Sequence, residues 1–356
     1  MMDYSVKLKK LLEGALDQGA SDIHISVGHP LTLRIAGKLI PLTRSRPISP
    51  AEAEGLAFSL MTENQKKTIL SEKEVDFSYN FENRARFRVN VFSQRGFIAA
   101  ALRLIPNRIP TIEELNLPLI LHEFIRPSQG FILVTGASSQ GKSTTLASMI
   151  DEINHIKAAH IITIEDPIEY LFVDDRSIID QRELGRDTLS FAKALRSTFR
   201  QDPDVIMVGE MRDQETIATA ITAAETGHLV MATLHTNSAS QSIHRIVNSF
   251  PGSQQNQIRN QLSTSLLGVI SQRLIPRARG GLIPACEILL NTAAVANLIR
   301  ENKIHEIPLV IETSAELGMI SMDRYLIDLV RRKEITLETA QAYSLTPSNF
   351  KSLMGK

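Results

Sequence analysis

Apolar and polar positions follow two different rhythms along the chain, and the change between them divides it into two parts. In the first part, apolar residues recur at helical spacing over residues 8–16, and Gly19 follows as a stop signal. The segments "DIHISV" and "LTLRIA" then alternate apolar and polar residues, as half-buried strands do. Ser49 and Pro50 are the residue types of a helix cap and a first helical position.

Three more apolar segments complete this first part after a second short helix. They read "VDFSYNF", "ARFRVNVF" and "GFIAAALRL", and the first two alternate strictly. We therefore predict that residues 1–105 form a small α+β domain in which helices cover an antiparallel sheet.

Prolines concentrate in "IPNRIPTIEELNLP", so we predict a linker at residues 106–118. Beyond it, short buried strands alternate with helical stretches; they read "FILVT", "HIITI", "DVIMV" and "LVMAT". This rhythm predicts an α/β domain with a parallel sheet over residues 119–291, followed by a helical region over 292–356. Ligands of such sheets bind beyond the carboxyl ends of the strands.

The turn after the first of these strands has the spacing of a phosphate-binding loop, G-x-x-x-x-G-K-[ST]. In such a loop, backbone N–H groups surround the phosphates, the lysine neutralises them, and the hydroxyl binds Mg²⁺. The nucleotide-binding candidates are Gly136, Ala137, Ser138, Ser139, Gln140, Gly141, Lys142, Ser143 and Thr144.

Carboxylates follow two other predicted strands. Glu210 comes directly after "DVIMV", where an acid can orient the metal ion of a phosphate-loop ATPase. Glu165, Asp166 and Glu169 follow "HIITI", and one of them could polarise the attacking water. Spacing alone leaves a helix cap and a solvated acidic turn as alternative interpretations.

Two histidines, His228 and His235, flank the strand "LVMAT". A single histidine at a strand end is more often structural than catalytic. A pair around one strand favours a place at the sheet edge where nucleotide binds.

Composition narrows the class of protein. The chain has 356 residues, with 39 Lys and Arg balanced by 39 Asp and Glu, which argues against a dedicated nucleic-acid binder. Cys286 is the only cysteine, so an internal disulfide and a cysteine-cluster zinc site are excluded. The charged N-terminus is not a signal peptide, and no apolar run reaches membrane-spanning length. We expect a soluble cytoplasmic protein.

Several of these segments together resemble the secretion-type ATPases, and within them the retraction ATPases of type IV pili, the PilT family. The matching segments are "TIEDPIEY", "LRSTFRQDPDVIMVGEMRDQET", "TAAETGHLVMATLHTNSA", "ALRLIPNRIPTIEELNLP" and "LGMISMDRYL". The resemblance implies a PAS-like N-terminal domain joined to a RecA-like ATPase domain. It also implies a ring of six identical subunits with ATP at the interfaces, located at the inner face of the cytoplasmic membrane without insertion.

The resemblance also implies roles for single residues. Lys142 and Ser143 fall on the phosphate and Mg²⁺ positions, Glu169 on the catalytic glutamate and Glu210 on the metal-orienting acid. His228 and His235 fall on the histidine-box positions. Arginines of the N-terminal domain reach the phosphates in this family, and Arg88 and Arg103 are our candidates. The implied partners are an inner-membrane pilus platform protein and a paralogous retraction ATPase.

Two departures from the family pattern stand out. The family writes its loop G-P-T-G-S-G-K-S, whereas this chain has Ser139 in place of the second glycine and Gln140 in place of serine. A side chain at position 139 strains the loop by about 1 kcal/mol if that position needs a positive φ. Ala296 also replaces the first arginine of the motif A-I-R-N-L-I-R-E, which is linked to retraction.

Four functions follow from these patterns. The first is a hexameric Mg²⁺-ATPase motor that retracts a pilus, with the linker as its hinge. The others are a pilus assembly or type II secretion ATPase, a hydrolysis-deficient subunit that regulates a partner ring, and a nucleic-acid translocase. The single cysteine and the absence of an extra N-terminal domain argue against the second. The hydrolysis-deficient subunit is opposed by the presence of Lys142, Glu169 and Glu210. The nucleic-acid translocase is opposed by the zero net charge.

Overall fold

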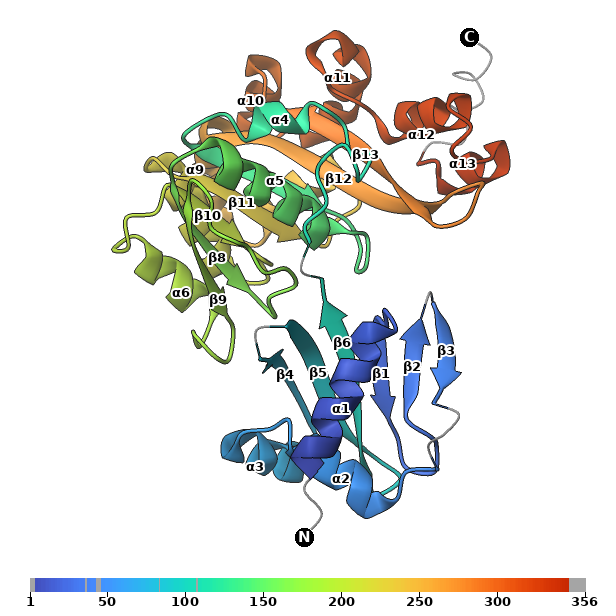
Figure 1. The fold of residues 1–356 in the computed structure, drawn as a ribbon. Coiled ribbons are helices and arrows are strands. Elements are labelled where there is room, and N and C mark those ends of the chain that lie inside the picture. Colours follow the sequence, from blue (N-terminus) through green and yellow to red (C-terminus); the bar gives the residue numbers. More distant parts are fainter. Residues whose placement is uncertain (1–3, 36, 43–45, 83, 107, 346–356) are drawn as a thin grey trace. The chain divides into compact units, whose positions relative to one another are not determined.

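The computed structural model describes residues 4–35, 37–42, 46–82, 84–106 and 108–345 (Figure 1). It divides the chain into two compact units. The first comprises residues 1–108 with 169–171, and the second comprises residues 109–168 and 172–356.

The first unit is an antiparallel sheet covered by helices. Its described strands lie in the order β3-β2-β1-β6-β5-β4, and every pair of neighbours is antiparallel. The elements are α1 (Tyr4–Asp17), β1 (Asp22–Ile25), β2 (Thr32–Ile35), β3 (Lys38–Pro41), α2 (Pro50–Phe58), α3 (Glu63–Glu72), β4 (Glu74–Phe81), β5 (Ala85–Gln94) and β6 (Phe97–Ile105).

Alternation along β5 explains how this sheet covers one core. Phe87, Val89 and Val91 are buried together with leucines of α1, whereas Arg88 between them is exposed. Ser49 caps α2 as expected, because its hydroxyl accepts a hydrogen bond from Glu52 N. The pattern did not reveal β3, whose four residues are all exposed and carry no alternation.

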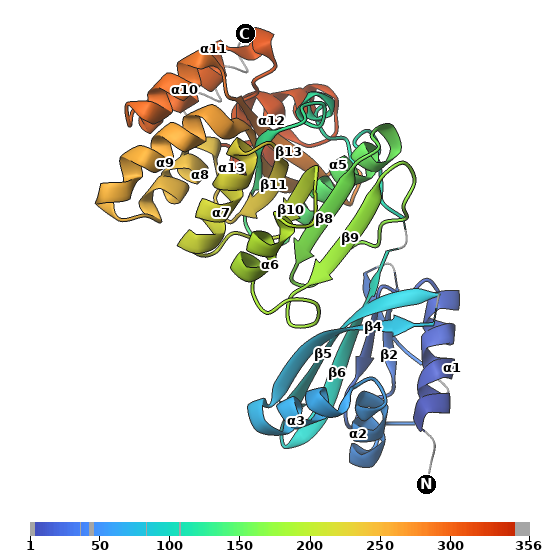
Figure 2. The same cartoon turned by 90° about the vertical axis from the view of Figure 1, so that its left-hand side faces the viewer.

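The second unit contains a sheet in the order β13-β12-β7-β11-β10-β8-β9. Figure 2 shows β11, β10, β8 and β9 of this sheet side by side. The strands from β12 to β9 pair in parallel, and β13 is antiparallel to β12. The strands are β7 (Gly130–Thr135), β8 (His160–Glu165), β9 (Ile178–Glu183), β10 (Val205–Val208), β11 (Leu229–Leu234), β12 (Leu266–Pro276) and β13 (Leu282–Leu290).

Helices cover both faces of this sheet. Phe131 and Leu133 of β7 pack with α6–α11, while Ile132 and Val134 pack with α4, α5, α12 and α13. The helices are α4 (Leu121–Phe124), α5 (Lys142–Ile156), α6 (Phe191–Thr198), α7 (Gln214–Glu225), α8 (Ala239–Asn248), α9 (Gly252–Ser265), α10 (Ala293–Arg300), α11 (Ile307–Thr313), α12 (Met322–Arg331) and α13 (Leu337–Tyr343), with 3₁₀ turns at Ile304–Glu306 and Ala315–Leu317.

The predicted α/β class, with an antiparallel first part, a parallel second sheet and a helical end, is confirmed. The four predicted parallel strands are present as β7, β8, β10 and β11, whereas β9, β12 and β13 were missed. Within the predicted linker, Ile112 and Leu117 are buried in the core of the second unit. The motif that contains Ala296 forms α10, which buries Val295 and Ile299.

Candidate functional site

The phosphate-loop motif lies between β7 and α5, where it connects a buried strand to the start of a helix. Gly136 and Gly141 both have positive φ angles, of 151° and 79°. A Cβ at Gly136 would lie 2.4 Å from Gln272 O, and one at Gly141 would lie 2.9 Å from Gln272 Nε2. Both glycines are therefore required by backbone conformation and by the close approach of β12.

Lys142 is buried inside the loop that it follows. Its ammonium donates hydrogen bonds to Gly136 O at 2.9 Å and to Ala137 O at 2.8 Å. Ser143 and Thr144 follow in the first turn of α5 and are half-buried. A positive charge enclosed by a backbone loop at a helix N-terminus is the arrangement that binds a polyphosphate.

Glu210 lies at the carboxyl end of β10 in contact with two basic side chains. Arg212 Nη2 lies 2.8 Å from Glu210 Oε2, and His235 Nε2 lies 3.2 Å from Glu210 Oε1. Burial raises the pKa of Glu210, but the Arg212 hydrogen bond and the charges of His235 and Lys142 outweigh it, so the pKa is lowered. The carboxylate is held ionised, as a metal ligand must be.

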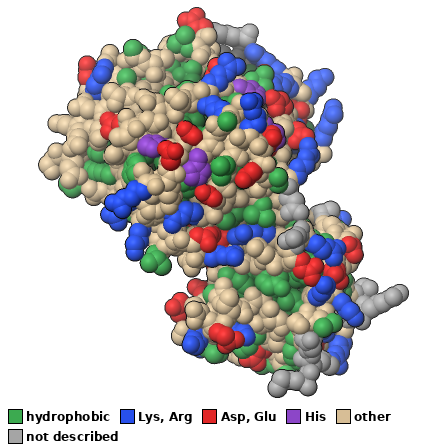
Figure 3. Space-filling model, turned by 60° about the vertical axis from the view of Figure 1, so that its left-hand side comes forward, with side chains coloured by type: hydrophobic (Ala, Val, Ile, Leu, Met, Phe, Trp, Pro, Cys, Tyr) green, Lys and Arg blue, Asp and Glu red, His purple; other side chains and the backbone are tan. Residues whose placement is uncertain are grey.

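His235 links Glu210 to the phosphate loop. Its Nδ1 lies 3.5 Å from the Ser138 hydroxyl, while its Nε2 faces Glu210. On the face of the larger unit that Figure 3 shows, acidic, basic and histidine side chains lie interspersed. The structure therefore brings Ser138, Lys142, Glu210 and His235 together at the carboxyl edge of the sheet.

His228 lies elsewhere, and the expectation that both histidines sit at one sheet edge is wrong. His228 precedes β11 and His235 follows it, so the six-residue strand separates them. His228 Nδ1 lies 2.9 Å from Ala223 O, and its ring packs edge-on against Phe199. The reason is topological, since the amino ends of parallel strands lie at the edge opposite the phosphate loop.

The acidic segment after β8 divides into buried and exposed parts. Glu165 is buried and accepts hydrogen bonds from Thr163 Oγ1 at 2.6 Å and Gln181 Nε2 at 3.1 Å. Its burial contradicts the alternative interpretation of this segment as a solvated acidic turn throughout. Asp166 is exposed and raises the pKa of Arg212 as a minor contribution beside Glu210. Glu169 is also exposed.

The two candidate arginines belong to the exposed face of the sheet in the first unit. Arg88 on β5 pairs directly with Arg103 on β6, and Arg103 pairs with Asp22 on β1. Arg103 Nε donates to Asp22 Oδ1 at 2.8 Å. Arg34 Nε lies 3.6 Å from the other oxygen of Asp22. One carboxylate thus accompanies three guanidinium groups, an arrangement that favours an anion nearby.

The unusual loop residues take conformations that motif reasoning only partly predicted. Ser139 has a φ of 61°, so its backbone adopts the left-handed conformation. For a residue with a side chain, this conformation costs about 1 kcal/mol relative to glycine. Gln140 contacts β12 through its side chain and its backbone. Sequence reasoning missed Gln272, the partner on β12, because that strand was not predicted; its run of apolar residues was the available signal.

Other kinds of site find less support. Among the residues that the structure describes, no group of three His, Cys, Asp or Glu side chains is placed to hold a metal ion. No helix in the described part of the chain is both long and apolar enough to cross a membrane.

Comparisons with known proteins agree with this geometry. A family model described as type II/IV secretion system protein matches residues 4–312. The type IV pilus retractation ATPase PilT of Pseudomonas aeruginosa is 43% identical over 343 residues, covering 96% of this chain and 99% of that protein. A twitching motility protein of Neisseria gonorrhoeae is 48% identical over 295 residues, covering 83% and 79%. A crystal structure of the pilus retraction motor PilT with bound ADP shares 47% identity and a TM-score of 0.91, covering 97% of this chain and 98% of that one.

Proposed function

The chain belongs to the family of type II/IV secretion system proteins, and from this we propose that it is an ATP-hydrolysing motor that powers type IV pilus retraction. One observation carries the proposal: the phosphate-loop Lys142, the ionised Glu210 and His235 meet at one edge of the sheet. The similar retraction motor was crystallised with ADP, which supports nucleotide binding here.

The loop from Gly136 to Thr144 would hold the phosphates of ATP. Backbone N–H groups and the N-terminus of α5 supply donors, and the Lys142 ammonium would exchange its carbonyl partners for phosphate oxygens. His235 would sense the terminal phosphate, because it bridges the loop and Glu210. His228 supports the far end of β11 instead.

The residues present fit a magnesium ion that is shared with the nucleotide. Mg²⁺ is usually held by one or two protein oxygens together with phosphates and waters, so three clustered acids are not needed. The Ser143 hydroxyl and the Glu210 carboxylate, with its lowered pKa, would be those ligands. When bound, the ion neutralises charge on the transferred phosphate.

Hydrolysis would be completed by Glu169 and by arginines of the first unit. An exposed carboxylate after β8 suits the polarisation of the attacking water. Arg88 and Arg103 would stabilise the phosphates, since their pairing on neighbouring strands leaves excess positive charge. Arg103 already binds Asp22, so Arg88 is the stronger candidate.

We propose a ring of six subunits with ATP at the interfaces, in which closure of a PAS-like first domain on a RecA-like second domain performs the work. Because Ile112 and Leu117 pack in the second core, the hinge would be the part of the linker before Ile112. A pilus platform protein at the inner membrane would receive this work at the cytoplasmic face, and a paralogous retraction ATPase would be a second partner.

The test is Mg²⁺-dependent ATP hydrolysis by the purified protein over a concentration series that spans ring assembly. Glu169→Gln and Lys142→Ala are measured beside the wild type. Activity that rises with assembly and is lost in both variants supports the motor. Bound ATP without hydrolysis at any concentration would reject the motor and favour a regulatory subunit.

A further inference from the structure

Gln140, which stands where the family loop has serine, joins the phosphate loop to β12. Its side-chain Oε1 accepts a hydrogen bond from Leu274 N at 2.6 Å. Its backbone oxygen accepts one from Gln272 Nε2 at 2.7 Å. Gln140 is the acceptor in both bonds, so one residue is fixed at both its side chain and its main chain.

The end of β7 explains why β12 needs such a partner. The pairing between β7 and β12 stops at Thr135 and Ser271, while β12 continues to Pro276. The N–H of Leu274 lies beyond this point, and a backbone donor inside a fold requires an acceptor. The side chain of Gln140 supplies that acceptor, which β7 no longer provides beyond its last paired residue.

Gln272 extends the same contact to the helix after the loop. It is buried, and its Oε1 accepts a hydrogen bond from Thr145 Oγ1 at 2.7 Å. One side chain of β12 therefore holds Gln140 before Gly141 and Thr145 after it. The loop and the first turn of α5 are thus tied to the same strand.

The neighbouring Ser139 makes this attachment more important. Its backbone adopts a left-handed conformation at a position where the family has glycine. The serine side chain makes this conformation, and so the loop shape, less favourable. The Gln140 contacts favour that loop shape, and they join protein groups only.

We propose that Gln140 is a positioning residue that fixes the phosphate loop on β12 in its nucleotide-binding shape and offsets the unfavourable Ser139. The proposal rests on the proposed function, since it concerns nucleotide affinity at the same site. Preorganisation of a loop raises affinity by lowering the ordering entropy lost on binding. The nucleotide should therefore bind more weakly when the Gln140 contacts are removed.

The first test replaces Gln140 by methionine, which keeps its length but removes the acceptor. A fluorescent ADP analogue gives the dissociation constant, and ATP hydrolysis gives kcat and KM for the full-length protein. We expect Gln140→Met to raise the dissociation constant about 5-fold and to raise KM in parallel. Gln255→Met is the matched control, because it removes the hydrogen bond that Gln255 on α9 donates to Phe250 O, outside the site.

A second set of variants addresses the coupling between the two loop residues. Gln140→Ser lacks the reach to Leu274 N, and Ser139→Gly relieves the left-handed side chain. We expect Gln140→Ser to weaken binding and the double variant to recover part of the loss, as in a double-mutant cycle. Faster hydrogen exchange at Leu274 N in Gln140→Met, without nucleotide, would show that the contact itself is lost.

The outcomes separate this inference from the proposed function. If the wild type hydrolyses ATP and Gln140→Met binds nucleotide as tightly as the wild type, the inference is overturned and the motor stands. If the wild type binds ADP but does not hydrolyse ATP, while Gln140→Met weakens binding, the motor is rejected and the inference stands. Failure of the wild type to bind nucleotide would overturn both.

Discussion

Glu210 and Asp213 are acids three residues apart whose surroundings give them different tasks. Glu210 contacts Arg212 and His235 at the strand end, whereas Asp213 caps α7 by accepting a hydrogen bond from Thr216 N at 2.8 Å. We predict that Glu210→Gln keeps nucleotide binding but lowers kcat about 10- to 100-fold, because the Mg²⁺ ion that we propose would lose a charged ligand. Steady-state hydrolysis and ADP-analogue binding measure the two effects.

Asp213→Ala is the control for this prediction. Loss of the cap should lower the free energy of unfolding by about 1 kcal/mol and leave kcat nearly unchanged. Equal losses of kcat in both variants would show that Glu210 acts only through the local fold.

The two histidines provide a second comparison between similar residues. We predict that His235→Asn lowers kcat about 10-fold, because it removes a group between the loop and Glu210. His228→Asn should change kcat less and thermal stability more, since His228 contacts Ala223 O and Phe199 at the other end of β11. A larger loss of kcat in His228→Asn than in His235→Asn would contradict this assignment.

At the scale of single residues, the sequence predicts those candidate positions that local spacing determines. Lys142 and Glu210 could be identified because a motif and a strand end fix their positions. The separation of His228 from His235 required the strand direction to be followed through to the edge of the sheet. The contact between Gln140 and Gln272 could not be predicted, because it joins residues 132 positions apart through one hydrogen bond from a side chain to a backbone oxygen.

At the scale of helices and strands, the first residue of α8 contacts a buried carboxylate, that of Glu287. Glu287 on β13 accepts a hydrogen bond from Ala239 N at 2.8 Å, and burial raises its pKa above 4.5, although that bond and Arg273 oppose the change. A group with a raised pKa stabilises the fold below its unfolded pKa, and this contribution is lost as pH rises through the folded pKa.

We therefore predict that the wild type loses stability relative to Glu287→Gln as pH increases from about 4 to 7, by an amount on the order of 1 kcal/mol. Denaturant unfolding of both proteins over this range measures the difference. A difference that does not vary with pH would show that Glu287 titrates alike in the folded and unfolded chains.

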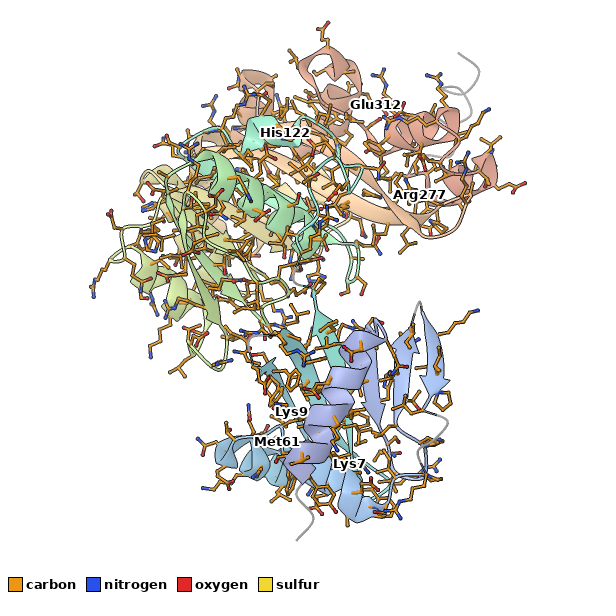
Figure 4. The ribbon with its side chains drawn as sticks, viewed as in Figure 1. Lys7, Lys9, Met61, His122, Arg277 and Glu312 are labelled. Atoms are coloured by element: carbon orange, nitrogen blue, oxygen red, sulfur yellow. The ribbon has the colours of Figure 1, made fainter. Side chains whose placement is uncertain are left out.

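His122 connects three elements of the second unit (Figure 4). It lies on α4, with its Nδ1 2.6 Å from Glu152 on α5 and its Nε2 2.9 Å from Glu113 in the predicted linker. The hydrogen bond with Glu152, and the charge of both glutamates, raise its pKa above 6.5 although burial opposes the change. The ion pairs thus attach the linker segment to the phosphate-loop helix.

We predict that this attachment weakens as the medium becomes alkaline. The stabilisation is complete below pH 6.5 and is lost as pH rises through the raised pKa of His122. Because the groups are partly exposed, we expect a loss of about 0.5 kcal/mol. Denaturant unfolding of wild type and His122→Gln between pH 6 and 9 checks this, and parallel curves for the two proteins would contradict it.

The success of element prediction depended on alternation and burial. The strands β7, β8, β10 and β11 were identified because each is a short, almost completely apolar run. β9 carries Asp180, Gln181 and Arg182, as expected for an edge strand, and therefore gave no signal. β12 and β13 follow each other closely and are as long as helices, so periodicity alone could not identify them.

For the whole molecule, the residues that we propose to act on ATP come from both units of the chain. Lys142, Glu210 and His235 belong to the second unit, whereas Arg88 and Arg103 lie on an exposed sheet face of the first. In the proposed ring, either the same subunit or its neighbour would supply the arginines at a given ATP.

If ATP binds at ring interfaces as we propose, Arg88 acts on the nucleotide of a neighbouring subunit. Arg88→Ala and Lys142→Ala should then each be inactive alone, because every interface lacks one of the two groups. In mixed rings some interfaces combine an intact Lys142 with an intact Arg88 from the next subunit, so hydrolysis should return. The measurement is ATP hydrolysis by the two variants, separately and mixed, at concentrations where rings assemble. Hydrolysis that stays absent in mixed rings, although both variants assemble, would place Arg88 and Lys142 of one chain at the same ATP.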